Sequence, residues 1–412
     1  MSRISIHTIA FVFFLLPVIA LAQPAPMPAD DNSLTARYPF VSTVFNRIFN
    51  SSGLDSFYHK LYRLRTTNTG TVSIVHIGDS HIQAGSLSGV VRTGLQDFFG
   101  DAGRGLVFPY QLARSNAPDD IGSTSNNTWQ FNRVAHPEIP LAPGISGFAI
   151  TSTSPVANID LFIKSTGTTF PAYNRLKFFT DSNTSVSWIL QAAGNGIPYI
   201  IRREDGDTSL YQEIQLQQPV GSFTLSSLPS GADKTFYGVS LENSRPGVLY
   251  HTIGVNGARY DQYNLADLFW QQLPGLKADL FIISLGTNEA QRAAFAEAAF
   301  FTELSVFLQN LKKAAPGAAI LITTAPDSYK GRHSNAVLRS LNVSLTEYCN
   351  RNYLPLWDLY RITNGYGSAY SWVRRGLMAR DRVHFTTEGY RLQGSLLLNA
   401  LARGYNNYIS IF

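Results

Sequence analysis

Apolar residues follow two alternating patterns over both ends of the chain. Short runs rich in β-branched residues have the length of buried strands, at 71–78, 278–286 and 318–326. Longer stretches repeat apolar residues every three to four positions, as on one face of a helix, at 38–64, 88–100, 300–316, 335–352 and 388–405. Because strands alternate with helices of ten or more residues, the pattern predicts an α/β fold in three layers, α/β/α, with a parallel sheet in the middle.

The middle of the chain has a different pattern. Between about 125 and 245, short apolar segments are separated by Gly, Pro, Asn and Asp, and helical periodicity is absent. The candidate strands are 147–153, 158–165, 175–181, 185–191, 211–217, 222–228 and 236–242. Many short strands between turn residues are typical of a β-sandwich. We therefore expect a sandwich at 125–245, inserted into an α/β domain made of 38–124 and 246–412. A single mixed domain with a long β excursion is the alternative.

Residues 1–22 have the features of a secretory signal peptide. A basic residue precedes an apolar run, and Ala20-Leu21-Ala22 forms a small-x-small cleavage site. The sequence thus predicts cleavage after Ala22, export across the inner membrane and no stable insertion in it; an uncleaved anchor is the alternative. The Pro-rich, polar segment that follows predicts a flexible leader at 23–37.

Composition excludes several classes of function. The formal net charge is +5, but the basic residues are scattered without a block, so nucleic-acid binding is not expected. Cys349 is the only cysteine, so it has no partner for an intramolecular disulfide and is expected to be buried. The eight histidines are dispersed and no Gly-rich phosphate loop is found, so we expect neither metal nor cofactor. Oligomeric state has no signal in the sequence.

The first candidate for chemistry is Ser80, in the stretch "IVHIGDSHIQAG". A residue at the carboxyl end of a buried parallel strand faces the crevice where open α/β sheets place their sites. A serine that is followed by a helix can also use backbone N–H groups to bind an oxyanion. Alternatively, Ser80 only caps that helix.

A serine hydroxyl needs a neighbouring base before it becomes a good nucleophile. The stretch "ARDRVHFTTEGY" supplies His384, with Asp381 three residues before it. This spacing lets the carboxylate reach the Nδ1–H of the ring and leaves Nε2 free for Ser80. An Asp-His pair that merely caps the last helix is the alternative.

Two further motifs follow apolar segments. In "SLGTNEA", Asn288 offers a side-chain amide that suits oxyanion stabilisation, although turn chemistry would equally explain it. In "IGVNGARYDQY", Gly257 can present its backbone N–H close to a substrate, and Gly254 is the other candidate for this role. Each motif is weak by itself.

Together and in this order, the four motifs resemble the SGNH/GDSL hydrolase superfamily. The resemblance rests on Gly78-Asp79-Ser80, Gly257, Gly286-Thr287-Asn288 and Asp381-Arg382-Val383-His384. It implies that Ser80 is the nucleophile, His384 its base and Asp381 the partner of the base. Ser80 N–H, Gly257 N–H and the Asn288 side chain would form the oxyanion hole. The third block commonly continues with Asp, whereas Glu289 follows here, which narrows the subfamily.

The finer resemblance is to periplasmic peptidoglycan O-acetylesterases, which carry a sandwich similar to a family-35 carbohydrate-binding module between the first two blocks. The matching stretches are "GDSHIQAG", "VLYHTIGVNGA" and "SLGTNEA". This implies a serine esterase that acts on an acetylated glycan, peptidoglycan first. An esterase for acetylated xylan or an exopolysaccharide, an O-acetyltransferase and a non-catalytic glycan-binding protein are the alternatives.

The remaining polar and aromatic candidates are expected to be structural. We predict core roles for His76 and His251, and a substrate contact for His81 is open. Five aromatic residues of the insertion have the chemistry to stack on sugars, although core packing is the simpler role for each: Trp129, Tyr173, Trp188, Tyr199 and Tyr211.

Overall fold

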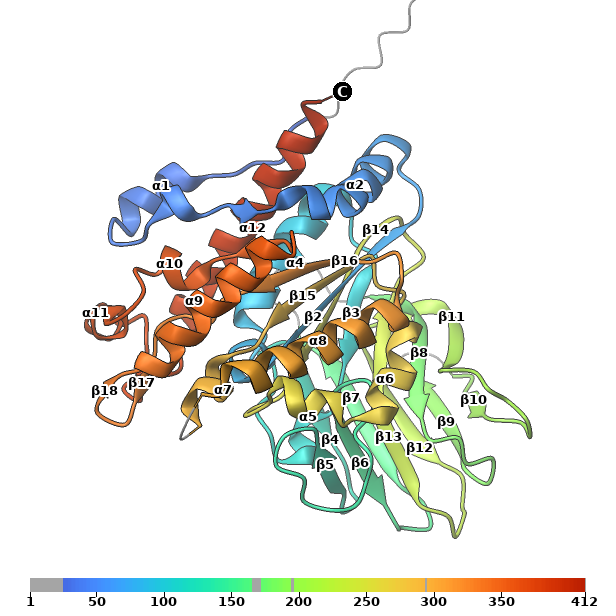
Figure 1. Ribbon diagram of the computed structural model, residues 1–412. Coiled ribbons are helices and arrows are strands. Elements are labelled where there is room, and N and C mark those ends of the chain that lie inside the picture. The colour runs from blue at the N-terminus through green and yellow to red at the C-terminus, as the bar shows by residue number, and fades with distance from the viewer. Residues whose placement is uncertain (1–24, 165–171, 194–195, 293–294, 412) are drawn as a thin grey trace, which may run out of the picture.

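The protein is described by a computed structural model that covers residues 25–164, 172–193, 196–292 and 295–411 (Figure 1). The predicted signal peptide therefore lies outside the described residues. A three-layer α/β part and a group of antiparallel strands, β4 to β13, share the molecule. No helix within the described ranges is long and apolar enough to cross a membrane.

Six described strands form the central sheet in the order β1-β19-β16-β15-β2-β14. Neighbours run parallel except β1 and β19, which are antiparallel. The strand bounds are β1 Ile48–Phe49, β2 Thr71–Gly78, β14 Gly247–Gly254, β15 Leu280–Ser284, β16 Ala319–Thr323 and β19 Leu356–Trp357. The predicted strands at 71–78, 278–286 and 318–326 are confirmed, and so is the α/β class.

The register of this sheet brings three motifs to one edge. Gly78 at the end of β2 is paired on one side with Gly254 of β14 and on the other with Ser284 of β15. The chain therefore leaves these three parallel strands side by side, where open α/β sheets bind their ligands. A Cβ on Gly78 would lie only 2.4 Å from Ile82 Cγ1, so the sharp turn into the next helix requires glycine here.

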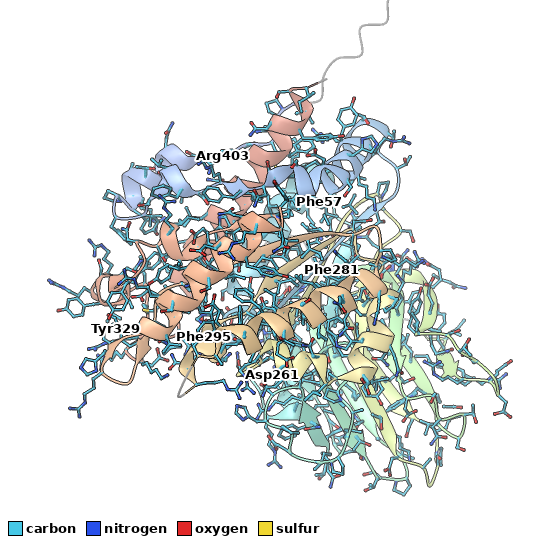
Figure 2. The ribbon with its side chains drawn as sticks, viewed as in Figure 1. Phe57, Asp261, Phe281, Phe295, Tyr329 and Arg403 are labelled. Atoms are coloured by element: carbon cyan, nitrogen blue, oxygen red, sulfur yellow. The ribbon has the colours of Figure 1, made fainter. Side chains whose placement is uncertain are left out.

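Helices cover both faces of the sheet. Apolar side chains of α2, α4 and α12 pack on one face of the sheet, and those of α8 and α9 pack on the other. Phe57 of α2 belongs to the first of these cores and Phe281 of β15 to the second (Figure 2). The alternation of strand side chains between faces produces two cores from one sheet. The helix bounds are α1 Asp31–Arg37, α2 Asp55–Thr67, α3 Ser80–Gln83, α4 Ser86–Phe99, α5 Tyr260–Asn264, α6 Asp267–Gln272, α7 Thr287–Gln291, α8 Glu297–Ala314, α9 Ala336–Arg351, α10 Leu359–Ile362, α11 Ser368–Arg374 and α12 Thr387–Ile409.

The antiparallel strands form two sheets, ordered β10-β9-β12-β7-β4 and β11-β8-β13-β6-β5; β3 also pairs with β13, at 239–242, beyond the stretch that pairs with β6. All seven strands predicted in the insertion are present, within one to three residues at their ends. The bounds are β3 Gly103–Val107, β4 Ile121–Thr124, β5 Gln130–Arg133, β6 Phe148–Ser152, β7 Asn158–Ile163, β8 Tyr173–Thr180, β9 Ser187–Ala192, β10 Tyr199–Arg202, β11 Gln212–Val220, β12 Ser222–Ser227 and β13 Lys234–Glu242. A small hairpin pairs β17 Tyr329–Lys330 with β18 His333–Ser334.

The two parts are joined by one continuous hydrophobic core. Side chains of the sandwich, such as Phe178, belong to the same buried cluster as Phe281 of the central sheet. The antiparallel pairing also begins before residue 125, because β3 and β4 already pair with β13 and β7. The domain boundaries at 125 and 245 therefore stay a prediction, with strands of the second part found on the near side of the first boundary.

The segment expected to be a flexible leader is attached to the fold over its described part. Met27 is buried, and its backbone exchanges two hydrogen bonds, of 2.7 and 2.8 Å, with the side-chain amide of Asn406 on α12. Asp30 then caps α1, because its carboxylate accepts a hydrogen bond from the backbone N–H of Ser33. Composition alone concealed these contacts, since the partner lies 379 residues away.

Candidate active site

Ser80 stands directly after β2, at the first position of the short helix α3. Asp79 is the N-cap of this helix, and its carboxylate accepts the backbone N–H of His81 at 2.9 Å. The backbone N–H of Ser80 belongs to the first turn of a helix, where no preceding carbonyl of the helix is available to accept it. Ser80 thus lies beyond the end of the sheet, and its backbone N–H makes no hydrogen bond within the helix.

The structure joins Ser80, His384 and Asp381 in one chain of hydrogen bonds. Ser80 Oγ lies 2.9 Å from His384 Nε2, and His384 Nδ1 lies 2.7 Å from Asp381 Oδ2. Because an ionised carboxylate only accepts, Nδ1 carries the proton and Nε2 accepts from the serine hydroxyl. Two residues that are 304 positions apart in the chain therefore meet as the motif order predicts.

The loop that carries Asp381 and His384 is tied at several points. Ala379 N–H donates to the carbonyl of His384 at 2.8 Å, which closes the loop. The second carboxylate oxygen of Asp381 accepts the backbone N–H groups of Val383 and His384 at 2.9 and 3.0 Å. Partial burial opposes ionisation of Asp381, but hydrogen bonds from Val383 N–H and from His384 outweigh it and lower the pKa. The carboxylate thus stays charged and fixed against the ring.

His81 lies beneath His384 rather than in the cleft. Its side chain is buried, its ring centroid is 5.6 Å from that of His384, and Nδ1 is 2.9 Å from the Tyr390 hydroxyl. Burial lowers the pKa of His81 to about 3, so the ring is neutral. His81 therefore packs against the ring of His384 and is not among the residues that line the cleft described below.

Two other histidines are structural, as predicted. His76 is fully buried inside β2, with Nδ1 2.8 Å from the Tyr250 hydroxyl and Nε2 2.8 Å from Ser284 Oγ. His251 is also fully buried, and its Nδ1 accepts the backbone N–H of Leu106. Burial lowers the pKa of both imidazoles to about 3, which is the expected effect of desolvation on a base.

A cleft of about 520 Å³ opens beside Ser80. It brings together the residues predicted for nucleophile, base and oxyanion donors. Its lining comprises Ser80, Ala84, Asn116, Asn256, Gly257, Asn288, His384 and Tyr390. Gly257 has a φ of 83°, a left-handed conformation that favours glycine. Gly254 is paired with Gly78 in the sheet and is not among the residues that line the cleft.

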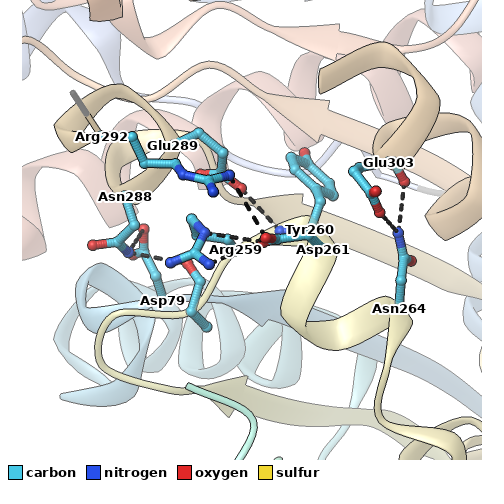
Figure 3. A network of polar contacts seen from close by, with 10 residues as sticks. Asp79, Arg259, Tyr260, Asp261, Asn264, Asn288, Glu289, Arg292 and Glu303 are labelled. Carbon is cyan, nitrogen blue, oxygen red and sulfur yellow. Dashed lines mark hydrogen bonds and ion pairs between the residues drawn. The ribbon is translucent and has the colours of Figure 1, made fainter. Parts of the chain in front are cut away.

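The amide of Asn288 is held from two sides (Figure 3). Its Nδ2 donates to the carbonyl of Ala258 at 3.0 Å and to Asp79 Oδ2 at 3.2 Å. Burial raises the pKa of Asp79 to about 7. Asp79 therefore links two parts of the site: Oδ1 accepts a hydrogen bond from the start of α3, and Oδ2 accepts one from Asn288.

Glu289, which stands where the third sequence block of the superfamily commonly has Asp, also connects two segments of the site (Figure 3). Its Oε1 accepts the backbone N–H of Tyr260 at 2.9 Å, which ties α7 to the segment that follows Gly257. Burial raises the pKa of Glu289 to about 7, and its Oε2 has no hydrogen-bond partner among the described residues. Outside this buried layer, Asp261 pairs with Arg259 at 3.0 Å and Arg292 at 3.7 Å.

Sequence reasoning missed the wall of the cleft. Gln83, fully buried on α3, donates to the side-chain and backbone oxygens of Asn116 and accepts the backbone N–H of Asn256 at 2.7 Å. Asn256 Nδ2 also donates to Asn116 Oδ1 at 2.7 Å. The available signal was the position of Gln83 three residues after Ser80, one turn further along the same helix.

The aromatic candidates of the sandwich divide into two groups. Trp129, Tyr173 and Trp188 are buried in the core, as the simpler interpretation predicts. Tyr199 and Tyr211 are partly exposed and pack at the edge of the core. Within the described part of the chain, no three His, Cys, Asp or Glu side chains are grouped so as to hold a metal ion.

Comparison with known proteins agrees with this geometry. Residues 227–392 match the GDSL-like Lipase/Acylhydrolase family, a range that includes Gly257, Asn288, Asp381 and His384, whereas Ser80 precedes it. None of the curated proteins matches this chain in sequence. A solved peptidoglycan O-acetylesterase is 22% identical with a TM-score of 0.72, covering 85% of this chain and 96% of its own.

Two further solved structures are similar to parts of the chain. A lipase/acylhydrolase from Enterococcus faecalis is 21% identical over 38% of this chain and 77% of its own, with a TM-score of 0.30. A family two carbohydrate esterase from Cellvibrio japonicus is 12% identical over 70% and 98%, with a TM-score of 0.28. Residues 227–392 are thus similar to a GDSL-like hydrolase domain, and most of the chain has the fold of the solved O-acetylesterase.

Proposed function

We propose that this protein is a serine esterase that removes O-acetyl groups from a bacterial cell-wall glycan, and that its substrate is peptidoglycan acetylated on the 6-hydroxyl of muramic acid. The observation that carries the proposal is the hydrogen-bonded chain Ser80–His384–Asp381, which opens into a cleft that also holds Gly257 and Asn288. The substrate is supported by the resemblance of nearly the whole chain, sandwich included, to a peptidoglycan O-acetylesterase.

In the proposed mechanism, Ser80 Oγ attacks the acetyl carbonyl while His384 Nε2 takes its proton. Asp381 keeps the proton on Nδ1 and stabilises the imidazolium that forms. The tetrahedral oxyanion is bound by the N–H groups of Ser80 and Gly257 and by the Asn288 amide. His384 then protonates the departing sugar oxygen, and the acetyl group stays on Ser80.

Water completes the reaction by the same route in reverse. His384 takes a proton from a water molecule that attacks the acetyl-enzyme, and Ser80 leaves with that proton. Asn288 Nδ2 donates to the carbonyl of Ala258 at 3.0 Å and to Asp79 Oδ2 at 3.2 Å, so binding the oxyanion would replace or share the longer bond, the one to Asp79. The same cleft needs neither metal nor cofactor for this chemistry.

The proposed location is the periplasm, where peptidoglycan lies, after cleavage of the predicted signal peptide at Ala22. The sandwich would hold the glycan near the cleft in the manner of a carbohydrate-binding module. Its partly exposed aromatic side chains, Tyr199 and Tyr211, are the first residues to examine for this role.

Acetate release distinguishes the candidate functions. Wild type and Ser80→Ala are compared on O-acetylated peptidoglycan and on acetylated xylan. Release from peptidoglycan that disappears in the variant is the expected result. A preference for xylan would move the enzyme to polysaccharide breakdown with the same site. Transfer of acetyl to an added acceptor sugar would identify a transferase. A folded protein without any of these activities would contradict the proposal and favour a glycan-binding role.

A further inference from the structure

A second pocket, of about 440 Å³, lies beside the catalytic cleft. Ala84, four residues after Ser80, lines both of them. Tyr390 lines the cleft and its neighbour Arg391 lines the second pocket. The two spaces therefore adjoin across α3 and the start of α12, within reach of different parts of one substrate molecule.

Three arginines line this second pocket, which is called the arginine pocket below. Arg104 on β3 has a side chain only 4% exposed, and Arg92 lies on α4. Both pair with one carboxylate, Asp120, at 2.5 Å from Arg104 Nε and 3.2 Å from Arg92 Nη2. Two guanidinium groups thus share a single counter-charge.

The shared carboxylate leaves donors unused. Burial favours the neutral acid, but Arg104 and Arg92 outweigh it and lower the pKa of Asp120 to about 2, so this group is fully ionised. Arg104 uses Nε and Nη2 on Asp120, and its buried Nη1 has no partner among the described residues. A buried donor without a partner is unfavourable unless a ligand or water meets it.

The rim adds one charge of each sign. Arg391 and Asp119 are both exposed at the pocket, so they offset each other and the lining as a whole keeps an excess of one positive charge. The floor beside them is open, because a Cβ on Gly89 of α4 would meet no atom within 4 Å. A planar, bidentate anion is the ligand that suits several guanidinium groups at once.

We propose that the arginine pocket binds a carboxylate carried by the acetylated glycan, so that the enzyme selects esters on acidic chains over esters on neutral ones. This inference rests on the proposed function, in which the acetyl group is removed from a glycan. The carboxylate comes from a peptide stem in peptidoglycan and from the sugar ring in a uronate polymer. Stem-bearing peptidoglycan is the source that the proposed function favours.

The test compares kcat/KM on four soluble substrates. Acetylated muropeptides are used with free and with amidated carboxylates, together with acetylated oligogalacturonide and neutral acetylated xylo-oligosaccharide. For the wild type, we expect kcat/KM on free muropeptide to exceed that on the amidated form by about tenfold, because amidation removes the charge that the guanidinium groups bind; tenfold corresponds to about 1.4 kcal/mol. The difference should lie in KM and shrink as salt is added.

Two variants address the pocket in independent ways. Arg391→Ala removes an exposed charge, and Gly89→Leu fills the pocket without changing any charge. Both should reduce the ratio of kcat/KM on free to amidated muropeptide toward one. Arg63→Ala, which removes an exposed arginine of α2 on another part of the surface, should keep the ratio of the wild type.

The outcomes separate the sources and the two proposals. A charge preference on muropeptide that both pocket variants abolish supports a stem carboxylate, and the same result on oligogalacturonide alone supports a uronate. Equal kcat/KM on free and amidated muropeptide, together with no preference for oligogalacturonide over the neutral chain, would overturn the inference. Absence of acetate release from every glycan would instead overturn the proposed function, since the arginine pocket affects preference and not the ester chemistry.

Discussion

The His384–Asp381 pair and the surroundings of Asn288, the two halves of the candidate site, differ in solvent exposure. The side chains of His384 and Asp381 are 44% and 50% exposed, on a loop at the surface. The groups behind the proposed oxyanion donors are buried: Asp79 is 1% exposed and Glu289 is 9% exposed. The proton-transfer half is thus open to solvent and substrate, whereas the half that positions Asn288 is built into the core.

This difference teaches how the site divides its tasks. A general base must reach substrate and water, so exposure of His384 costs little and its geometry is fixed by hydrogen bonds within its loop. Oxyanion donors stabilise charge best when they are held in place before the reaction. The chain accepts two buried carboxyl groups with raised pKa values to hold them there. The exposed half should therefore be separable from stability, and the buried half should not.

Removal of the base should have the largest effect on activity and almost none on stability. His384→Ala should lower kcat on an acetyl ester by about 10⁴- to 10⁶-fold, because Ser80 loses its proton acceptor. The free energy of unfolding should change by less than about 1 kcal/mol, since the side chain is half exposed. The double variant with Ser80→Ala should be no slower than either single variant, and a further loss would show that the two residues do not act as a unit.

Removal of the amide donor should affect both properties. Asn288→Ala should lower kcat by about 10²- to 10³-fold with little change in KM. It should also lower the free energy of unfolding by about 1–3 kcal/mol, because Asp79 and the carbonyl of Ala258 lose a buried donor. Steady-state kinetics and urea unfolding measure the two effects. A loss of activity without loss of stability would show that the buried Asp79 is not coupled to the donor.

A change at the second donor should produce a smaller effect. Gly257→Ala places a Cβ on a left-handed residue with φ of 83°, at a cost of about 1–2 kcal/mol, and 2.9 Å from His136 Nε2. Relaxation of this strain and of the close contact should move the N–H and lower kcat about tenfold. Gly206→Ala is the matched control, because Gly206 has the same φ of 83° in the sandwich with no atom near its Cβ. Both variants should lose stability, and only the first should lose kcat. Equal kinetics for both would argue against Gly257 as a donor.

The smallest effect is expected for Glu289→Gln, a neutral substitution of the same shape. It should change only how the free energy of unfolding depends on pH. The folded-state pKa of about 7 exceeds the ordinary value of 4.5. Below pH 4.5 both states are protonated, and between 4.5 and 7 the unfolded chain releases its proton first, so wild-type stability falls as pH rises. Glu289→Gln keeps the acceptor for Tyr260 N–H and removes this loss.

The stability gained by Glu289→Gln should therefore grow from pH 4.5 to 7 and then level at about 1–3 kcal/mol. Urea unfolding at a series of pH values measures it. Asp79 has a pKa in the same range and its charge is one cause of the raised pKa of Glu289, so the comparison is repeated in an Asp79→Asn background. Glu297→Gln, at an exposed glutamate of α8, is the control for the change of residue type. A pH-independent difference for Glu289→Gln would contradict a buried, protonated carboxyl.

The sequence predicted the elements that repeat a simple pattern. Strand β2 was recognisable as a run of β-branched residues with the length of a buried strand, and helix α9 because its apolar residues recur every three to four positions. Strand β3 was missed because Gly103 and Gly105 suggest a turn, whereas both have positive φ values inside a strand. Short polar strands such as β5 had no pattern to detect.

For the site, the order of the motifs predicted which residues come together, but the side-chain contacts between distant segments could not be predicted from the sequence. Ser80, Asn288 and His384 were named because each follows a strand end or belongs to a recognisable block, and the sheet register then brings the strand ends together. The wall formed by Gln83 and Asn256 spans 173 residues of sequence and depends on rotamers, for which no local pattern exists. The parts that the sequence did not reveal are the long-range polar contacts.

The most direct test is covalent labelling of the proposed nucleophile. Wild type and His384→Ala are treated with a fluorophosphonate probe, and the rate and position of the adduct are measured by peptide mass spectrometry. A single adduct on Ser80 that forms rapidly in the wild type and at least about 10³-fold more slowly in His384→Ala is the expected result. An adduct on another residue, or equal rates in both proteins, would contradict a serine activated by His384.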